Sequence, residues 1–329
     1  ESYPTLIDHD DTSRNFSNVG QTPYLYWTRL NQSVGDNYER DLMRVQISFE
    51  KIFMDGITVT VRGDAEDING GDGECLTGLG DCTLRAALQE SARRPHWYND
   101  SLLAINFELE TSSHTIFVNS PLDRVYFPTI LDGTTDAVHV ANSNDFADGM
   151  NATYAAWLRG DYPDLEIRAD NTVIKGLEID GTVVLLSDHN TLTGNSIGRI
   201  QIDSSAYNTL GGSDNADRNR FGSIRINGPD ANFNTIEGNY IGTDLDGTAS
   251  AGSEFSAINI GYGADENWVL NNLMSGSGFA GIEIGPDPGT AENNLVQGNV
   301  IGLDRTATVK IPNAASGIKV GGVSGTIIR

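Results

Sequence analysis

One short phrase occurs six times in this chain and constrains its fold more than any other feature. Each copy opens with Asn, has an aliphatic residue two positions later, and in most copies turns at Gly or Asn before a further aliphatic residue. The copies begin at Asn171, Asn190, Asn208, Asn234, Asn267 and Asn294. The spacing of these starts indicates a unit of about 18–20 residues with insertions of variable size. Strands of three or four residues joined by tight corners predict a coil and exclude a hairpin sheet.

These repeats predict an all-β chain that folds as a right-handed parallel β-helix, in which each coil stacks on the last at about 4.8 Å. Asn suits a corner because it tolerates the left-handed backbone region and can hydrogen-bond to the same amide one coil above. Glycine also tolerates the left-handed region, so corners are expected at Gly181, Gly194, Gly238 and Gly298.

A second phrase alternates inward aliphatic residues with outward polar ones and predicts another face of the solenoid. Its outward residues are Arg225, Asn259, Glu283 and Lys319, which are expected to form a solvated face. Less regular coils are expected earlier, at residues 102–107, 114–118 and 128–133.

The segment before these coils predicts a cap. Apolar residues at 84, 87, 88 and 92 form a helical stripe over Cys82–Ala92, which Thr83 is placed to cap. A short helix here would cover the first open coil of a solenoid. We therefore expect an N-terminal extension at 1–54, with one strand at 45–49 and a candidate role in docking, a cap at 55–95 and the β-helix at 96–329.

The two cysteines, Cys75 and Cys82, lie close together with no others to pair with. A local disulfide is the favoured interpretation, and it indicates an oxidising compartment. Free or metal-binding thiols are the alternative, which is disfavoured because no second Cys or His pair lies nearby.

Composition narrows the function. With 21 Lys+Arg against 45 Asp+Glu the net charge is −24, which excludes binding of nucleic acid by phosphate neutralisation. No apolar run approaches the roughly 18 residues of a membrane span. The acidity suits a secreted protein, as do the candidate N-glycosylation sites Asn15, Asn31, Asn99 and Asn151. The chain begins at Glu1 without Met and is expected to be a processed or trimmed product.

The segments 57–64, 71–75 and 80–91 resemble the capping segment of bacterial surface and secreted proteins with a Cys-Ser/Thr-Leu-Arg-Glu-Ala motif. The phrase that starts at Tyr240 is similar to the β-helix repeats that follow that motif, so the resemblance covers about residues 57 to 329. Ala86 stands where the family more often has Glu. The resemblance implies an extracellular, adhesin-like β-helix on a bacterial surface, and it implies no single activity.

Polysaccharide chemistry is the rival to a structural role, since Asp, Lys and Arg on an outer face of a β-helix can bind or cleave glycans. The candidate glycan-contacting residues are Asp214, Asp217, Arg218, Arg220 and Arg225. An exposed loop with mutually neutralising charges is the favoured alternative, because nothing in the sequence fixes their geometry. The charge of −24 also disfavours an anionic glycan unless a metal intervenes.

No catalytic residue is predicted. The stretch Gly194-Asn-Ser196-Ile-Gly198 fits a hydrolase nucleophile pattern, but the Ser slot holds Tyr240 and Val300 in other copies, so Ser196 is interpreted as a repeat position. The five histidines lack zinc spacing.

No cofactor is required by this interpretation, and calcium is the candidate ion. Hard oxygen donors gather in a Gly-rich loop beside the cysteines and at a later Asp-Gly turn. The candidate ligands are Asp64, Asp67, Asn69, Asp72 and Glu74 in the first, and Asp244 and Asp246 in the second. Metal-free Asp-Gly turns are the favoured alternative at both.

Residues 323–329 have the form that opens a coil, so we expect either a longer parent chain or self-association at the open coil. The sequence thus predicts an extracellular or cell-surface structural or adhesive protein, with end-to-end assembly into a filament or sheath as a hypothesis. A polysaccharide-active lyase, epimerase or hydrolase, or a non-catalytic glycan-binding module, is the alternative.

Overall fold

The computed structural model describes residues 5–7, 24–34, 37–46, 56–93, 102–109, 114–285 and 291–329. The chain divides into two compact units, Glu1–Phe53 and Met54–Arg329. The first unit contains an antiparallel sheet of β1 (Thr5–Ile7), β2 (Tyr24–Val34) and β3 (Asn37–Gln46). Strand β3 includes the first two residues of the strand expected at 45–49, and the rest of that segment lies outside the described residues.

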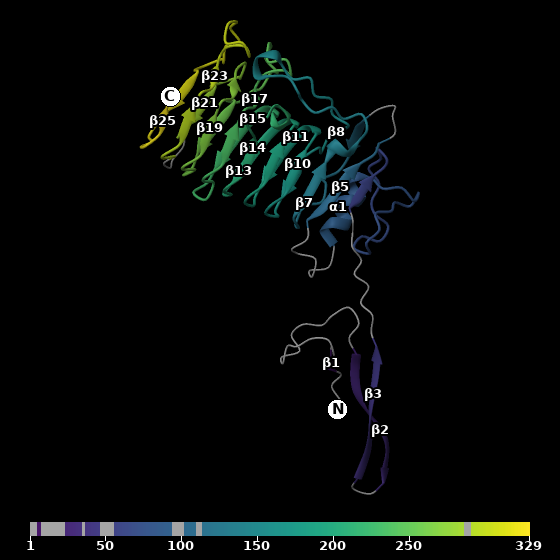
Figure 1. Ribbon diagram of the computed structural model, residues 1–329. Helices are drawn as coiled ribbons and strands as arrows, with labels where there is room; N and C mark the ends of the chain where they lie inside the picture. The colour runs from purple at the N-terminus through teal and green to yellow at the C-terminus, as the bar shows by residue number, and fades with distance from the viewer. Residues whose placement is uncertain are drawn as a thin grey trace. The chain divides into compact units, whose positions relative to one another are not determined.

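Two large sheets, in which every strand pair is parallel, make up the second unit (Figure 1). The first sheet has the spatial order β4 (Ile57–Val59), β5 (Leu103–Phe107), β7 (Thr129–Asp132), β10 (Val173–Lys175), β12 (Thr191–Thr193), β14 (Thr209–Gly211), β16 (Thr235–Glu237), β19 (Trp268–Leu270), β22 (Leu295–Gln297) and β25 (Ile327–Ile328). The predicted fold class, an all-β parallel β-helix, is confirmed, as are the early coils at 102–107, 114–118 and 128–133.

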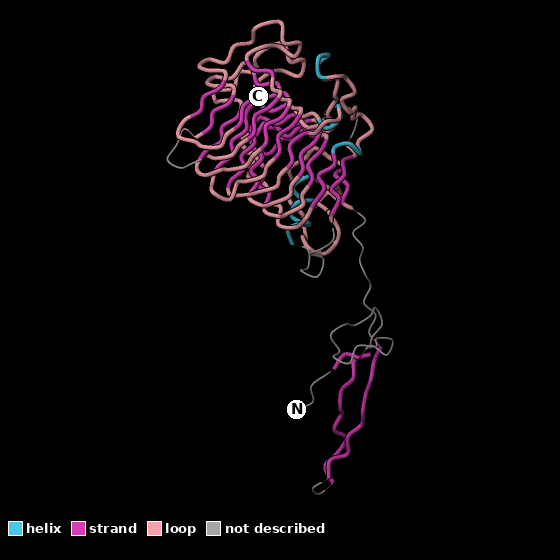
Figure 2. Tube along the Cα trace, turned by 60° about the vertical axis from the view of Figure 1, so that its left-hand side comes forward, coloured by secondary structure: helices cyan, strands magenta, loops and turns pink. Residues whose placement is uncertain are grey.

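The second sheet has two columns of strands. One column is β6 (Thr115–Val118), β8 (Ala156–Gly160), β17 (Tyr240–Ile241), β20 (Leu273–Met274) and β23 (Val300–Ile301), and the other is β9 (Leu165–Ile167), β18 (Ile258–Gly261), β21 (Ile282–Ile284) and β24 (Ile318–Val320). Three long strands, β11 (Leu177–Leu185), β13 (Ser196–Asp203) and β15 (Arg220–Asn227), run through both columns. Figure 2 shows these strands stacked in rows, with loops projecting from one end.

Aliphatic side chains stack in register inside the solenoid and form one continuous core. On the first sheet the buried column is Ile174, Leu192, Leu210, Ile236 and Val269. Alternate residues of each short strand point inward, which is the alternation that the repeated phrase predicts. The outward row Arg225, Asn259, Glu283 and Lys319 is in register on adjacent strands. The expectation of a solvated face was wrong for Glu283, which is 8% exposed because Ser256, Asn259 and Lys319 surround its carboxylate.

Two ladders of asparagines run through the coils, and all of them are buried except Asn299, which is half-buried. The first is Asn190, Asn208, Asn234, Asn267 and Asn294, and the second is Asn195, Asn219, Asn239, Asn272 and Asn299. In each ladder the side-chain oxygen of one Asn accepts the backbone N–H of the Asn one coil before it. The first ladder was predicted from the sequence. The second lies at the other turn of the same phrase and was missed.

The left-handed corner lies one residue earlier than predicted. His189, Tyr207 and Phe233, each directly before a ladder Asn, have φ of 58–59°, and the ladder residues themselves have no positive φ. The first copy is out of register by one position: Asn171 takes the corner, with φ of 59°, and Thr172 takes the ladder slot. Asn is therefore selected in the ladder for its amide and not for its backbone freedom.

The cap contains α1 (Leu84–Arg93), which packs Leu84, Ala87 and Leu88 onto the core of the first coils. Thr83 caps this helix as predicted, because its hydroxyl accepts the backbone N–H of Ala86 at 3.0 Å. The predicted disulfide between Cys75 and Cys82 is confirmed. Among the described residues, no helix is long and apolar enough to cross a membrane.

Candidate functional site

A groove of about 390 Å³ lies on the outer face of the second sheet, where β11, β13 and β15 run through both columns. The next coil interrupts the columns with an inserted loop, residues 242–257, between β17 and β18. Residues 251–255 of this loop form one wall of the groove. The groove therefore lies where three coils with uninterrupted strands are followed by a coil that carries an inserted loop.

Glycines line the groove on three successive coils. They are Gly181, Gly198 and Gly222. A Cβ atom on Gly198 would lie 2.4 Å from the carbonyl oxygen of Asp180, and one on Gly222 would lie 2.2 Å from that of Gly198. Close stacking of the coils therefore requires glycine, and it leaves a floor without side chains. Gly181 has no positive φ, so it is not the left-handed corner predicted, whereas Gly194, Gly238 and Gly298 are.

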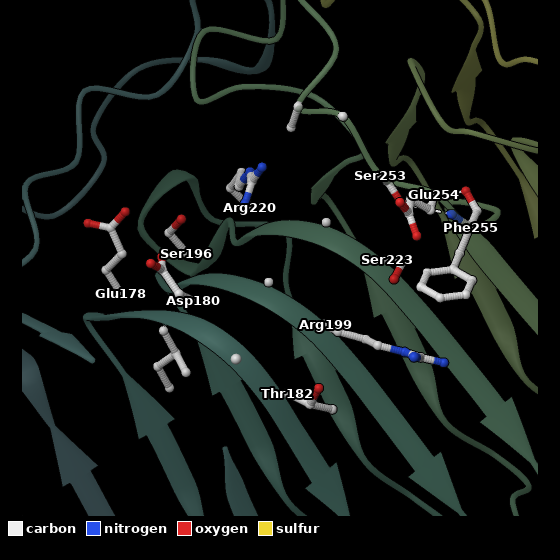
Figure 3. A pocket seen from close by; sticks show the side chains of 16 residues that line it. Glu178, Asp180, Thr182, Ser196, Arg199, Arg220, Ser223, Ser253, Glu254 and Phe255 are labelled. Atoms are coloured by element: carbon white, nitrogen blue, oxygen red, sulfur yellow. Dashed lines mark hydrogen bonds between the residues drawn. The ribbon is translucent and has the colours of Figure 1, made fainter. Parts of the chain in front are cut away.

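Two rows of side chains flank this floor (Figure 3). One row is Glu178, Ser196 and Arg220, and the other is Thr182, Arg199 and Ser223. Each row contains one residue from each of three coils, because parallel register stacks equivalent positions. Ser196, interpreted as a repeat position, lies between an acid and a base in the first row.

The first row carries the acidic end of the groove. Burial raises the pKa of the Glu178 carboxyl, and the charge of Asp180 raises it further, while Arg220 and Arg159 oppose the shift. The Asp180 carboxylate accepts hydrogen bonds from Trp157 Nε1 at 2.9 Å and from Arg159 Nε at 2.8 Å. One carboxyl is therefore biased toward its protonated form, while its neighbour is bound by a cation and an indole N–H.

Arg220 lies two coils along the same row from Glu178 and donates from Nε to the backbone oxygen of Thr243 at 2.9 Å. Burial lowers the pKa of its guanidinium, which the nearby Tyr154 and Glu178 oppose. The Tyr154 hydroxyl is buried and has no hydrogen-bond partner. Burial raises the pKa of Tyr154, and the charge of Glu178 adds to the rise. Glu178, Arg220 and Tyr154 therefore form one electrostatic group.

A second hollow of about 310 Å³ continues the groove along the solenoid and shares Arg199, Ser223, Glu254 and Phe255 with the first. Its other lining residues include Arg225, Asn259, Phe279 and Glu283. We call the two hollows together the outer groove. It crosses successive coils, so it follows the direction in which the coils stack.

An excursion of the chain between β7 and β8, which we call the arm (residues 136–155), lies against the later coils. Met150 N donates to the carbonyl of Leu245 at 2.9 Å, and Arg305 Nε donates to that of Ala147 at 2.8 Å. The arm helps to form a second, small core, which contains Phe146, Met150, Tyr240, Leu273 and Val300. It covers Tyr240, Leu273 and Val300, which continue the Glu178 row beyond Arg220, so the row becomes accessible again at Arg220 in the outer groove.

The glycan-contact candidates separate in the structure. Asp214 directly precedes the turn η4 (Asn215–Asp217), and Asp217 is its last residue; burial raises the pKa of Asp217, and the charge of Asp214 raises it further. Arg218 is 4% exposed and lies over the rings of Phe146 and Tyr240 under the arm. The remaining two candidates, Arg220 and Arg225, line the outer groove.

The calcium candidates beside the cysteines make contacts within the protein. Asp64 forms an ion pair with Arg85 at 2.9 Å, and Asp67 accepts the backbone N–H groups of Asn69 and Leu76. Asp72 accepts from the Asn69 side chain and from the backbone N–H of Glu74. These contacts account for the shape of the loop through Asx-type turns.

At the later turn, Asp244 accepts the backbone N–H groups of Thr248 and Ala249, and the carbonyl of Asp246 accepts from Arg305. Within the described ranges, no group of three or more His, Cys, Asp or Glu side chains is arranged to hold a metal ion. Calcium binding stays a prediction at both loops.

Asn151 is the one glycosylation candidate whose side chain falls within the described part of the chain. It is exposed, and its amide donates to the Ser143 hydroxyl at 3.0 Å. Asn31 belongs to β2, and Asn15 and Asn99 lie outside the described residues. Glycosylation stays a prediction.

Comparison of the chain with family models, curated proteins and solved structures gives no match.

Proposed function

We propose that the chain is an extracellular or cell-surface β-helix protein that binds a polysaccharide in the outer groove. The observation that carries the proposal is the open floor of three stacked glycines between two rows of polar side chains. A floor without side chains accommodates a flat ring, and polar rows on both sides can hydrogen-bond to its substituents. Phe255 and Phe279, 52% and 39% exposed, add apolar surface beside the polar groups.

The length and direction of the groove favour a polymer over a small ligand. Its two hollows are continuous across successive coils and together exceed the space that a single sugar occupies. The disulfide supports an oxidising, extracellular location. The resemblance of the cap supports a bacterial surface protein. A role as an adhesive component agrees with glycan binding, whereas assembly into filaments stays a prediction.

Thr182→Trp tests the site, because this change places a large ring beside the glycine floor from an outward position on β11. We expect it to weaken polysaccharide binding at least tenfold, measured by affinity electrophoresis in gels that contain neutral or anionic polysaccharides. The matched control is Thr191→Trp, an outward residue of β12 on the first sheet, which should bind as the natural chain does.

Two results would contradict the proposal. Unchanged binding by the Thr182→Trp variant would move the binding site away from the outer groove. Failure of the natural chain to bind any polysaccharide of the panel would remove the proposed function itself.

Cleavage of the bound polysaccharide is the second candidate function, and the Glu178–Asp180 pair favours it. Glu178 and Asp180 lie on the same face of β11. Burial biases the Glu178 carboxyl toward its protonated form, and Arg159 binds the Asp180 carboxylate. Glycoside hydrolysis uses one protonated and one ionised carboxyl in this way. In this scheme Glu178 donates a proton to the leaving glycosidic oxygen as the bond to the anomeric carbon breaks. The attacking water gives its hydroxyl to the anomeric carbon and its other proton to the Asp180 carboxylate.

Glu178→Gln tests this second function through the release of reducing ends from a bound polysaccharide. We expect a loss of about 100-fold or more in rate with binding retained, since a general acid contributes about 10²–10⁴-fold. The natural chain should lose activity as the pH rises through the raised pKa of Glu178, because only the protonated carboxyl can donate. Binding without release of reducing ends would restrict the groove to binding.

A further inference from the structure

Among the described residues, three arginines of the outer groove form no ion pair, although the chain has 45 Asp+Glu against 21 Lys+Arg. Within the described residues, acidic partners bind other arginines, including Arg85, Arg124, Arg159 and Arg168. No such ion pair includes Arg199, Arg220 or Arg225. The chain has a net charge of −24, so its overall electrostatic potential is negative. Arginines without ion-pair partners on neighbouring coils make the potential in the outer groove locally more positive.

Arg199 and Arg225 lie close together on adjacent strands. Arg199 pairs in register with Ser223 on β15, two positions before Arg225. Burial lowers the pKa of Arg199, and the charge of Arg225 lowers it further, with Asp203 opposing. Two like charges held this close cost free energy unless an anion lies between or beside them.

Both guanidinium groups are oriented by aromatic rings. The Arg199 guanidinium carbon lies 4.5 Å from the ring centre of Phe255, and that of Arg225 lies 5.8 Å from the ring centre of Tyr262. Figure 3 shows Arg199 extending along the groove toward Phe255. A stacked guanidinium retains its in-plane N–H donors for a planar anion.

Arg199 Nε is buried and has no hydrogen-bond partner. Of the carboxyls that line this part of the groove, Glu283 binds Lys319 at 2.6 Å, and Glu254 forms no ion pair with either arginine. A buried donor without an acceptor costs free energy, which a hydrogen bond to a ligand oxygen would recover. The unpaired donor is a second observation, independent of the charges, that indicates an acceptor from outside the chain.

We infer that the polysaccharide is anionic and that Arg199 and Arg225 hold a carboxylate or sulfate group of one of its sugars. This inference rests on the proposed function and names its substrate class. Guanidinium groups bind both anions through paired, charge-assisted N–H···O bonds. The remaining cation, Arg220, lies one hollow away toward Glu178, where it can contact a neighbouring sugar of the same chain.

The expected preference runs against the net charge of the protein. Long-range repulsion by a net charge of −24 disfavours any polyanion, so binding of one must come from short-range contacts. The sequence alone led to the opposite expectation, that an anionic glycan would require a metal. The local arrangement of arginines supplies the positive charge without one.

The test compares matched polysaccharides that differ only in charge: polygalacturonate with its methyl ester, and dextran sulfate with dextran. We expect the natural chain to bind at least one charged member ten times more tightly than its neutral partner. The first pair reports on carboxylate and the second on sulfate. Isothermal titration at constant ionic strength provides the Kd values.

The variant Arg199→Gln/Arg225→Gln should lower the affinity for the charged member at least tenfold. Arg62→Gln/Arg329→Gln, which removes the same charge outside the groove, should bind within twofold of the natural chain. Equal urea midpoints would establish that all chains are folded. Neither variant changes a buried residue, so both leave the core intact.

The outcomes separate the two proposals. Equal affinity for the neutral and charged members, or unchanged affinity in the groove variant, would overturn the anionic inference and leave polysaccharide binding in place. No binding to these four polysaccharides or to the wider panel would overturn both.

Discussion

Asn234→Ala is expected to lower the free energy of unfolding by about 3–5 kcal/mol, because one side chain satisfies four buried groups. Its oxygen accepts the backbone N–H and the amide of Asn208, each at 2.9 Å. Its amide donates to the Ser205 carbonyl at 3.1 Å and to the Asn267 oxygen at 2.9 Å. Alanine leaves these groups buried without that partner and leaves a void in the coil.

Urea unfolding followed by circular dichroism measures the total effect, and hydrogen exchange locates it. The backbone amide of Asn208 loses its acceptor, so its exchange should accelerate more than that of amides several coils away. Asn119→Ala is the control, since Asn119 is exposed and a surface change of this kind costs below about 0.5 kcal/mol. A similar loss in both variants would contradict a structural role for the ladder.

Arg85→Met is expected to destabilise the second unit by about 3–5 kcal/mol, because it leaves the Asp64 carboxylate, whose side chain is only 10% exposed, without its cation. Arg85 is 4% exposed. It binds Asp64 through Nε and Nη2, at 2.9 and 3.1 Å, and it also donates to the carbonyls of Ser120 and Pro121, each at 2.8 Å. One side chain thus connects the capping helix to the loop that follows β6.

A double-mutant cycle with Asp64→Asn isolates the ion pair from the carbonyl contacts. The double variant should lose less stability than the sum of the two single variants, because neither partner is then left as an unpaired charge. Arg159→Met supplies the exposed comparison: its pair with Asp180 has the similar separation of 2.8 Å, but both side chains are 43% exposed. That change should cost no more than about 1 kcal/mol. Equal losses for Arg85→Met and Arg159→Met would show that burial does not set the effect.

The fold was predictable because its determinants repeat in the sequence. An inward aliphatic residue and a ladder Asn recur in the coils from Asn190 onward, and register then stacks equivalent positions. The second ladder had the same signal, since Asn195, Asn239 and Asn299 each follow a Gly in copies of one phrase. The left-handed corner was predicted one residue too late, because Asn is favoured both in a ladder and in the left-handed region. The sequence does not distinguish the two roles, and only the backbone angles do.

The groove was less predictable because its lining residues come from separate coils and from an inserted loop, which only the folded chain brings together. Three of the candidates, Arg218, Arg220 and Arg225, are near one another in the sequence. Arg218 belongs to the loop between β14 and β15 and lies under the arm, whereas Arg220 and Arg225 are outward residues of β15 and lie in the groove. The alternation Leu177-Glu178-Ile179-Asp180 did carry a signal for two outward carboxyls. The wall at 251–255 carried none, since its contribution depends on how the inserted loop folds back.

The glycine floor separates the part of the site that must stay constant from the part that is free to vary. Any side chain at Gly198 or Gly222 would collide with the backbone of the preceding coil, so evolution has no gradual route to a new floor. The wall at 251–255 belongs to an insertion between two strands, and its length and composition can change without shifting the register of any coil. Descendants of such a chain would therefore acquire new ligand preferences by exchanging this loop while retaining the same solenoid.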